Sequence, residues 1–152
     1  MNQKIGEKMK ILSWNDEWNT NVPIIDEQHK QLIDLLNSIS SNSISDKDLI
    51  EKLIFYISNH FLTEEKIMFQ ISYPYELYHK HRQQHNDFTE LMLEISFKQI
   101  YHETVNEDFS ETIDKLKTFC FTWFQEHFLK TDKELSKFIH GGENIDHILL
   151  DK

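Results

Sequence analysis

The feature that most constrains the fold is a stripe of residues, mostly apolar, spaced three and four apart in four segments of the chain. The segments lie at about 24–41, 46–69, 75–98 and 107–130. In the first of them the stripe runs Ile25, His29, Leu32, Leu36 and Ile39. Steps of three and four place residues on one face of an α-helix, and such a face must be buried against a partner. Four helices of similar length joined by short loops predict an all-α protein, an antiparallel up-down-up-down four-helix bundle.

The length of 152 residues, with only 3 glycines and 2 prolines, fits a single helical domain spanning residues 1–152. We expect residues 1–23 to form an irregular N-terminal arm that carries two tryptophans, and residues 24–130 to form the bundle. Residues 131–152 form a C-terminal extension, in which Thr131 to Ile139 is a short helical piece. Ser45 or Asp46 can cap the second helix, and Pro74 prevents its continuation.

Composition excludes several classes of function. A net charge of −10 disfavours a nucleic-acid partner, because phosphate binding needs a basic patch. No run approaches the roughly 18 apolar residues of a membrane span, and the N-terminus lacks the apolar core of a signal peptide. Cys120 is the only cysteine, so neither a disulfide nor a cysteine-based zinc site is expected. These features together indicate a cytoplasmic protein.

Six polar residues occupy stripe positions that leucine would normally fill. They are His29, His60, Glu64, His81, His85 and His127. They fall near the start of the first and third helices and near the end of the second and fourth. In an antiparallel bundle these four ends meet, so the six side chains converge on one layer. Burying them together is costly unless something compensates, and a metal ion does so.

The number and type of ligands narrow the choice of metal. Five imidazoles are too many for one tetrahedral zinc ion, and magnesium and calcium prefer oxygen ligands. Iron, copper, nickel and zinc all accept imidazole with carboxylate, and a pair of octahedral ions bridged by carboxylates would use the whole set. Asp132, five residues after His127, is the candidate for a second carboxylate. Residues five apart do not align on a regular α-helix, so we predict a widened turn or a helix end between Lys130 and Asp132.

The segments IIDEQHKQLIDLLN, HFLTEE, HRQQHNDF and HFLKTD together resemble the hemerythrin family, and within it the single-domain bacteriohemerythrins. The resemblance covers Trp14 to Phe138. It implies two iron ions, Fe²⁺ or Fe³⁺, joined by an oxo or hydroxo bridge. It also implies the ligand set: Glu64 and Asp132 as bridging carboxylates, His81, His85 and His127 on one iron, and His29 and His60 on the other. The iron with two histidines keeps an open position, where O₂ would bind.

The resemblance implies reversible oxygen binding for carriage, storage or delivery, with dioxygen as the ligand and no enzymatic activity. One alternative is an oxygen or redox sensor that acts through a protein partner, which the lack of an attached signalling domain disfavours. Another is a di-iron oxidase, but the stripes show no extra acid or tyrosine to serve catalysis. A di-zinc site or an empty structural bundle is a third alternative.

Apolar side chains are expected to line the site, although plain core packing explains most of them equally well. The candidates are Leu32, Leu36, Phe61, Phe88, Trp123 and Phe124. Of these, Trp123 is expected to lie nearest, because it precedes His127 by one helical turn. Cys120 is interpreted as a small buried hydrophobic residue.

Overall fold

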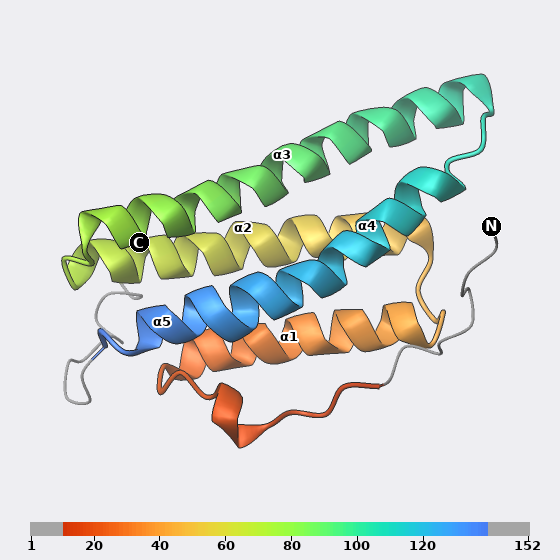
Figure 1. Ribbon diagram of the computed structural model, residues 1–152. Coiled ribbons are helices and arrows are strands. Elements are labelled where there is room, and N and C mark those ends of the chain that lie inside the picture. The colour runs from red at the N-terminus through yellow and green to blue at the C-terminus, as the bar shows by residue number, and fades with distance from the viewer. Residues whose placement is uncertain (1–10, 140–152) are drawn as a thin grey trace, which may run out of the picture.

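The computed structural model describes residues 11–139 and contains only helices and irregular segments within that range. The bundle consists of α1 (Pro23–Ser40), α2 (Asp46–Gln70), α3 (Tyr75–Val105) and α4 (Ser110–Trp123). A π-helical segment, η2 (Phe124–Asp132), continues α4 directly and passes into the short α5 (Lys133–Ser136). Figure 1 shows the start of α1, the end of α2, the start of α3 and α5 at one end of the bundle. The predicted all-α antiparallel bundle is confirmed.

The helix ends follow from local sequence. The side chain of Ser45 accepts a hydrogen bond from the backbone N–H of Asp48 at 3.1 Å, so Ser45 is the N-cap of α2, one of the two residues predicted. Helix α1 begins at Pro23 and not at Ile24. Proline suits the first helical position because it has no N–H to leave unpaired there.

The third helix is where the expected boundaries differ most from the structure. Helix α3 continues to Val105, not to about Lys98, because no glycine or proline interrupts it. It ends at Asn106, whose φ of 55° gives a left-handed C-cap. The fourth helix correspondingly begins at Ser110 and not at Glu107.

The bundle core has two parts of different chemistry. We call the first the apolar half; it contains Leu49, Leu53, Met92, Ile95, Ile113, Leu116 and Cys120, each at most 2% exposed. The second lies at the end where α1 and α3 start, and we call it the polar layer. It contains His29, His60, Glu64, His81, His85, His127 and Asp132, which are also at most 2% exposed.

The described part of the N-terminal arm packs on η2. Trp14 and Trp18 meet the ring of Phe128 edge-on, at centroid distances of 6.4 and 5.7 Å. Lys133, at the start of α5, donates to the backbone carbonyls of Glu17 and Asn19, both at 2.8 Å. The arm thus covers one side of the polar layer. Within residues 11–139, no helix combines the length and apolar character needed to cross a membrane.

Candidate metal centre

The regular helices position five of the seven candidate side chains. His60 and Glu64 are four residues apart on α2, as are His81 and His85 on α3, and that spacing puts each pair on one face, one turn apart. His29 comes from α1, and its side chain is 1% exposed. Each helix therefore brings its polar residues to the core on the same stripe as its leucines.

The π-helical segment brings in the remaining two. His127 and Asp132 are five residues apart within η2, and π-helical hydrogen bonds join residues five apart, so both side chains face the core. The predicted widened turn is therefore confirmed in kind. Its extent was wrong, because the widening covers all nine residues from Phe124 to Asp132 and not only the end after Lys130.

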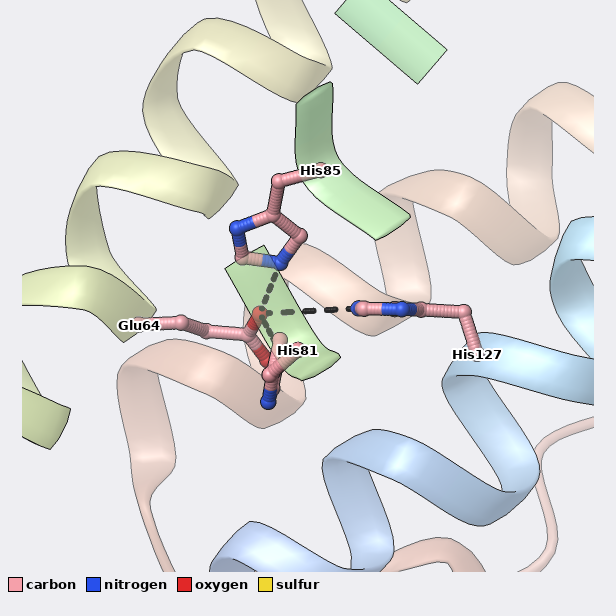
Figure 2. Close-up of side chains that lie close together, drawn as sticks. All are labelled: Glu64, His81, His85 and His127. Atoms are coloured by element: carbon pink, nitrogen blue, oxygen red, sulfur yellow. Dashed lines mark hydrogen bonds and ion pairs between the residues drawn. The ribbon is translucent and has the colours of Figure 1, made fainter. Parts of the chain in front are cut away.

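The carboxylate of Glu64 faces histidines on both sides. Its Oε2 lies 3.0 Å from Nε2 of His81 and 3.0 Å from Nε2 of His85. Its Oε1 lies 3.3 Å from Nε2 of His60. Figure 2 shows Glu64 pointing into the space enclosed by His81, His85 and His127.

Asp132 repeats this arrangement. Its Oδ1 lies 2.8 Å from Nε2 of His127 and 3.2 Å from Nε2 of His81. Its Oδ2 lies 2.7 Å from Nε2 of His29 and 3.3 Å from Nε2 of His60. Each carboxylate thus directs one oxygen at a three-histidine group and the other at a two-histidine group. The three-histidine group is His81, His85 and His127, and the two-histidine group is His29 and His60.

The ligand atoms form two sets, each compact enough to surround one metal ion. The candidate ligand atoms of Glu64 and the three-histidine group lie within 4.8 Å of one another. The same is true of Glu64, Asp132 and the two-histidine group. Within the described residues, His127 Nε2 and Asp132 Oδ1 face each other, and Glu64 Oε1 faces His60, at ion-pair distance but without the geometry of a hydrogen bond. Buried polar atoms paired in this way are costly, and a cation at each set would satisfy them.

The carboxylates and the histidines of the polar layer shift one another's pKa values. Burial alone would lower the pKa of His60 and His81, but the charge of Glu64 and hydrogen bonds to both carboxylates outweigh it and raise these values to about 9 and about 10. Burial likewise tends to raise the pKa of Glu64 and Asp132, yet the surrounding histidines hold both well below their ordinary values. In the metal-free protein, protonated His60 and His81 therefore balance part of the negative charge of the two carboxylates.

Behind the imidazoles lie polar side chains that sequence reasoning missed. The outer nitrogen Nδ1 of His60 lies 2.8 Å from Gln28 Oε1, and that of His127 lies 2.6 Å from Gln84 Oε1. The Nδ1 of His85 lies 3.1 Å from a carboxylate oxygen of Glu65. Their sequence signal was slight, because adjacent polar residues on a helix do not reveal which of them turns inward.

Aromatic rings enclose the layer. Trp123, expected to lie nearest the site, stacks on His127 at a centroid distance of 3.9 Å, but Phe61 stacks on His85 at the same 3.9 Å, so both rings lie equally close. Phe128, which the sequence reasoning did not name, lies 4.1 Å from the ring of His29. Leu32, Leu36, Phe88 and Phe124 are buried in the adjoining apolar cluster.

The sequence analysis considered only the stripes, on which no further acid or tyrosine lies, and so did not consider two such residues beside them that contact the site. Tyr56 stacks on His60 at a centroid distance of 5.1 Å, and Glu65 contacts His85. Both are offset from the stripe residues by one position, Tyr56 next to Ile57 and Glu65 next to Glu64. A strict stripe therefore excludes them, although the helix face that is buried is wider than the stripe.

Comparison with known proteins identifies the family. The model of the hemerythrin HHE cation-binding domain matches residues 20–139, a range that includes all seven residues of the polar layer. The chain belongs to the hemerythrin family. Among curated hemerythrin relatives, a bacteriohemerythrin of Stenotrophomonas maltophilia is 28% identical over 82% of this chain and 79% of its own length.

Two further relatives are also bacteriohemerythrins. A bacteriohemerythrin of Campylobacter jejuni is 30% identical over 64% of this chain and 75% of its own length. A bacteriohemerythrin of Pseudomonas aeruginosa is 31% identical over 47% of this chain and half of its own length. No solved structure matches the chain.

Proposed function

We propose that this hemerythrin-family protein binds molecular oxygen reversibly at two iron ions held in the polar layer. The observation that carries the proposal is that Glu64 and Asp132 each direct one oxygen at each histidine group. A carboxylate placed in this way joins two metal ions. The proposed ligands are His81, His85 and His127 for one ion, His29 and His60 for the other, and Glu64 and Asp132 for both.

The donor set supports iron. Imidazole nitrogen combined with carboxylate oxygen suits iron better than magnesium or calcium, and the described residues offer the site no thiolate of the kind that structural zinc usually takes. Iron, when bound, supplies the reversible change of oxidation state that oxygen binding requires. The names of the relatives, all bacteriohemerythrins, agree with this choice.

The protein's own residues give the two ions different surroundings. The two-histidine group offers one imidazole fewer, so we infer that the small ligand binds on the side of His29 and His60. Phe128 covers His29, and Tyr56 covers His60. These rings exclude bulk water from that side, which protects a bound oxygen molecule from protons and exchange.

An oxidase is the second candidate function, and Tyr56 is the observation that favours it. A phenol beside the two-histidine group, at 5.1 Å between ring centroids, is a group that an oxidase could oxidise. Reversibility separates the two functions, because a carrier returns its oxygen and an oxidase does not.

The test is to measure iron per chain and to record visible spectra without oxygen, in air and after oxygen removal. Two irons per chain, and an absorption band that appears in air and disappears on deoxygenation, are the expected results. Irreversible bleaching or oxidation in air would favour the oxidase or a sensor, and absence of iron would overturn the ligand assignment. The matched variants are His81→Ala, expected to lose iron, and His79→Ala, an exposed histidine on the same helix, expected to retain it.

A further inference from the structure

Gln84 links the π-helical segment to α3 at a single atom. Its Oε1 lies 2.6 Å from Nδ1 of His127 and 2.9 Å from the hydroxyl oxygen of Thr131. A side-chain carbonyl oxygen has two lone pairs, so it accepts from both donors at once.

The contacts of the inner nitrogen of His127 indicate which of its two ring nitrogens carries the proton. His127 Nε2 faces Asp132 Oδ1 at 2.8 Å and is the nitrogen that lies among the candidate ligand atoms. A neutral imidazole that offers Nε2 to a metal carries its proton on Nδ1, and that proton needs an acceptor. Gln84 Oε1 supplies it, which also fixes which end of the Gln84 amide faces His127.

The same contact secures the shape of η2. His127 and Thr131 stand on either side of the last π-helical turn, and Asp132 follows Thr131 directly. In a regular α-helix, Asp132 would be rotated away from the face of His127, because five residues exceed one turn by about 140°. Gln84 binds both His127 and Thr131 to α3, which fixes η2 against that helix and keeps Asp132, the residue after Thr131, directed at the core.

The two-histidine side of the layer contains a similar contact of a glutamine with a histidine and a threonine. Gln28 of α1 accepts from Nδ1 of His60 at 2.8 Å through Oε1 and donates through Nε2 to the hydroxyl of Thr63 at 2.9 Å. In both halves the glutamine directly precedes one layer histidine in sequence and the threonine directly precedes the layer carboxylate. This repetition on separate helix pairs indicates a positioning role and not a chance contact.

We propose that Gln84 is a positioning residue that, through Thr131 and His127, holds the π-helical segment in the shape that lets His127 and Asp132 bind metal together. The part of the proposal that concerns iron rests on the proposed function, whereas the part that concerns the shape of η2 does not. The two parts therefore take separate measurements.

The first measurement needs no metal. Backbone hydrogen exchange is followed in η2 of the metal-free protein for Gln84→Met, Thr131→Val and the control Gln83→Met. Gln83 is the exposed neighbour of Gln84, and among residues 11–139 its side chain bonds only Asp87 on its own helix. We expect faster exchange in residues 124–132 for Gln84→Met, a smaller increase for Thr131→Val, and none for Gln83→Met. Unchanged exchange in Gln84→Met overturns the proposal.

The second measurement is iron affinity and the midpoint potential of the iron-loaded protein. Loss of an outer hydrogen-bond partner typically weakens metal affinity about 10- to 100-fold. We therefore expect Gln84→Met to bind iron at least about 10-fold more weakly than the wild-type protein, and Gln83→Met to bind it equally well. Gln84→Glu restores an acceptor of similar length, so it should retain iron while lowering the potential, because a carboxylate makes the imidazole a stronger donor. A protein that folds but releases iron equally in Gln84→Glu and Gln84→Met contradicts the positioning role.

The outcomes separate the two ideas. If the wild-type protein and Gln83→Met bind no iron, the proposed function fails, and the exchange result alone decides whether Gln84 holds η2. If both bind two irons and Gln84→Met binds them as tightly, the proposed function stands and the positioning role is overturned.

Discussion

The two parts of the core are equally buried and opposite in chemistry. Leu53 and Leu116 in the apolar half are 0% exposed, and so are His60 and Glu64 in the polar layer. Burial of the leucines lowers the free energy of the folded protein. Burial of the polar groups raises it through lost hydration, unless a well-placed cation or counter-charge compensates. The apolar half therefore supplies most of the free energy of folding. That free energy offsets the cost of burying the polar layer, whose charges need a cation as partner.

The sharpest way to test this difference is to remove iron. We expect iron-loaded protein to exceed metal-free protein in unfolding free energy by about 4 kcal/mol for each iron bound, when free iron stands at a thousand times its dissociation constant. Anaerobic denaturant titrations with and without Fe²⁺ measure the difference. His81→Ala should show little of it, and an equal gain in that variant would mean that iron binds elsewhere.

Truncation in the apolar half should act independently of metal. Leu53→Ala leaves a cavity among fully buried neighbours and is expected to cost about 3 kcal/mol of unfolding free energy, in metal-free and iron-loaded protein alike. Leu62→Ala on the same helix, at a position 54% exposed, is the control and should change stability by less than about 0.5 kcal/mol. If Leu53→Ala lost its iron as readily as a layer variant, the two halves would not be separable.

The pH dependence of the metal-free protein should come from the polar layer. The pKa of His60 is raised to about 9 and that of His81 to about 10 from an ordinary 6.5, so their contribution is complete below pH 6.5 and is lost as pH rises through 9 and 10. The lowered pKa values of Glu64 and Asp132 give a contribution that is lost as pH falls below their ordinary 4.5 and 3.8.

The melting temperature of metal-free protein should therefore be highest between pH 4.5 and pH 6.5 and fall on both sides. Thermal scans from about pH 2 to about pH 10 measure it. Glu64→Gln should flatten the alkaline side, because the charge of Glu64 is the main cause of both raised histidine values. An alkaline slope that survives this substitution would place its origin outside the layer.

The smallest expected effect is at Cys120, the one cysteine, in the apolar half. Burial raises the pKa of its thiol to about 12, and its side chain is 1% exposed. We expect no reaction with a disulfide reagent at pH 8 in the folded protein and full reaction after unfolding, since the thiolate is the reactive form. Rapid reaction in folded protein would show that the apolar half opens locally.

Spacing along the chain was sufficient to predict the polar layer, but not the polar side chains that contact the outer nitrogens of its histidines. His60 with Glu64, and His81 with His85, follow from the four-residue repeat of a helix, and their meeting at one end follows from antiparallel packing. The contacts to the outer nitrogens depend on fine rotation. Gln83 and Gln84 are identical neighbours in sequence, and only the structure shows that Gln84 turns toward η2 while Gln83 faces solvent.

The helix boundaries show a second limit. The five-residue spacing of His127 and Asp132 required some widening, but it did not determine how many residues would share it, and the π-helical segment begins as early as Phe124. Similarly, α3 extends to Val105 because nothing in the sequence stops it before Asn106. The end of a helix is decided by the first residue that favours another conformation, and polar residues alone do not mark it.

The N-terminal arm has a consequence for timing. It is held by ring contacts of Trp14 and Trp18, by two hydrogen bonds from Lys133 and by two between Leu12 and Asn37, not by the packed face of a long helix. Segments with few buried contacts open more readily than helices of the core. Under the proposed function, opening of the arm would let water approach His29 past Phe128, so the residues before the first bundle helix would help to set how long oxygen stays bound.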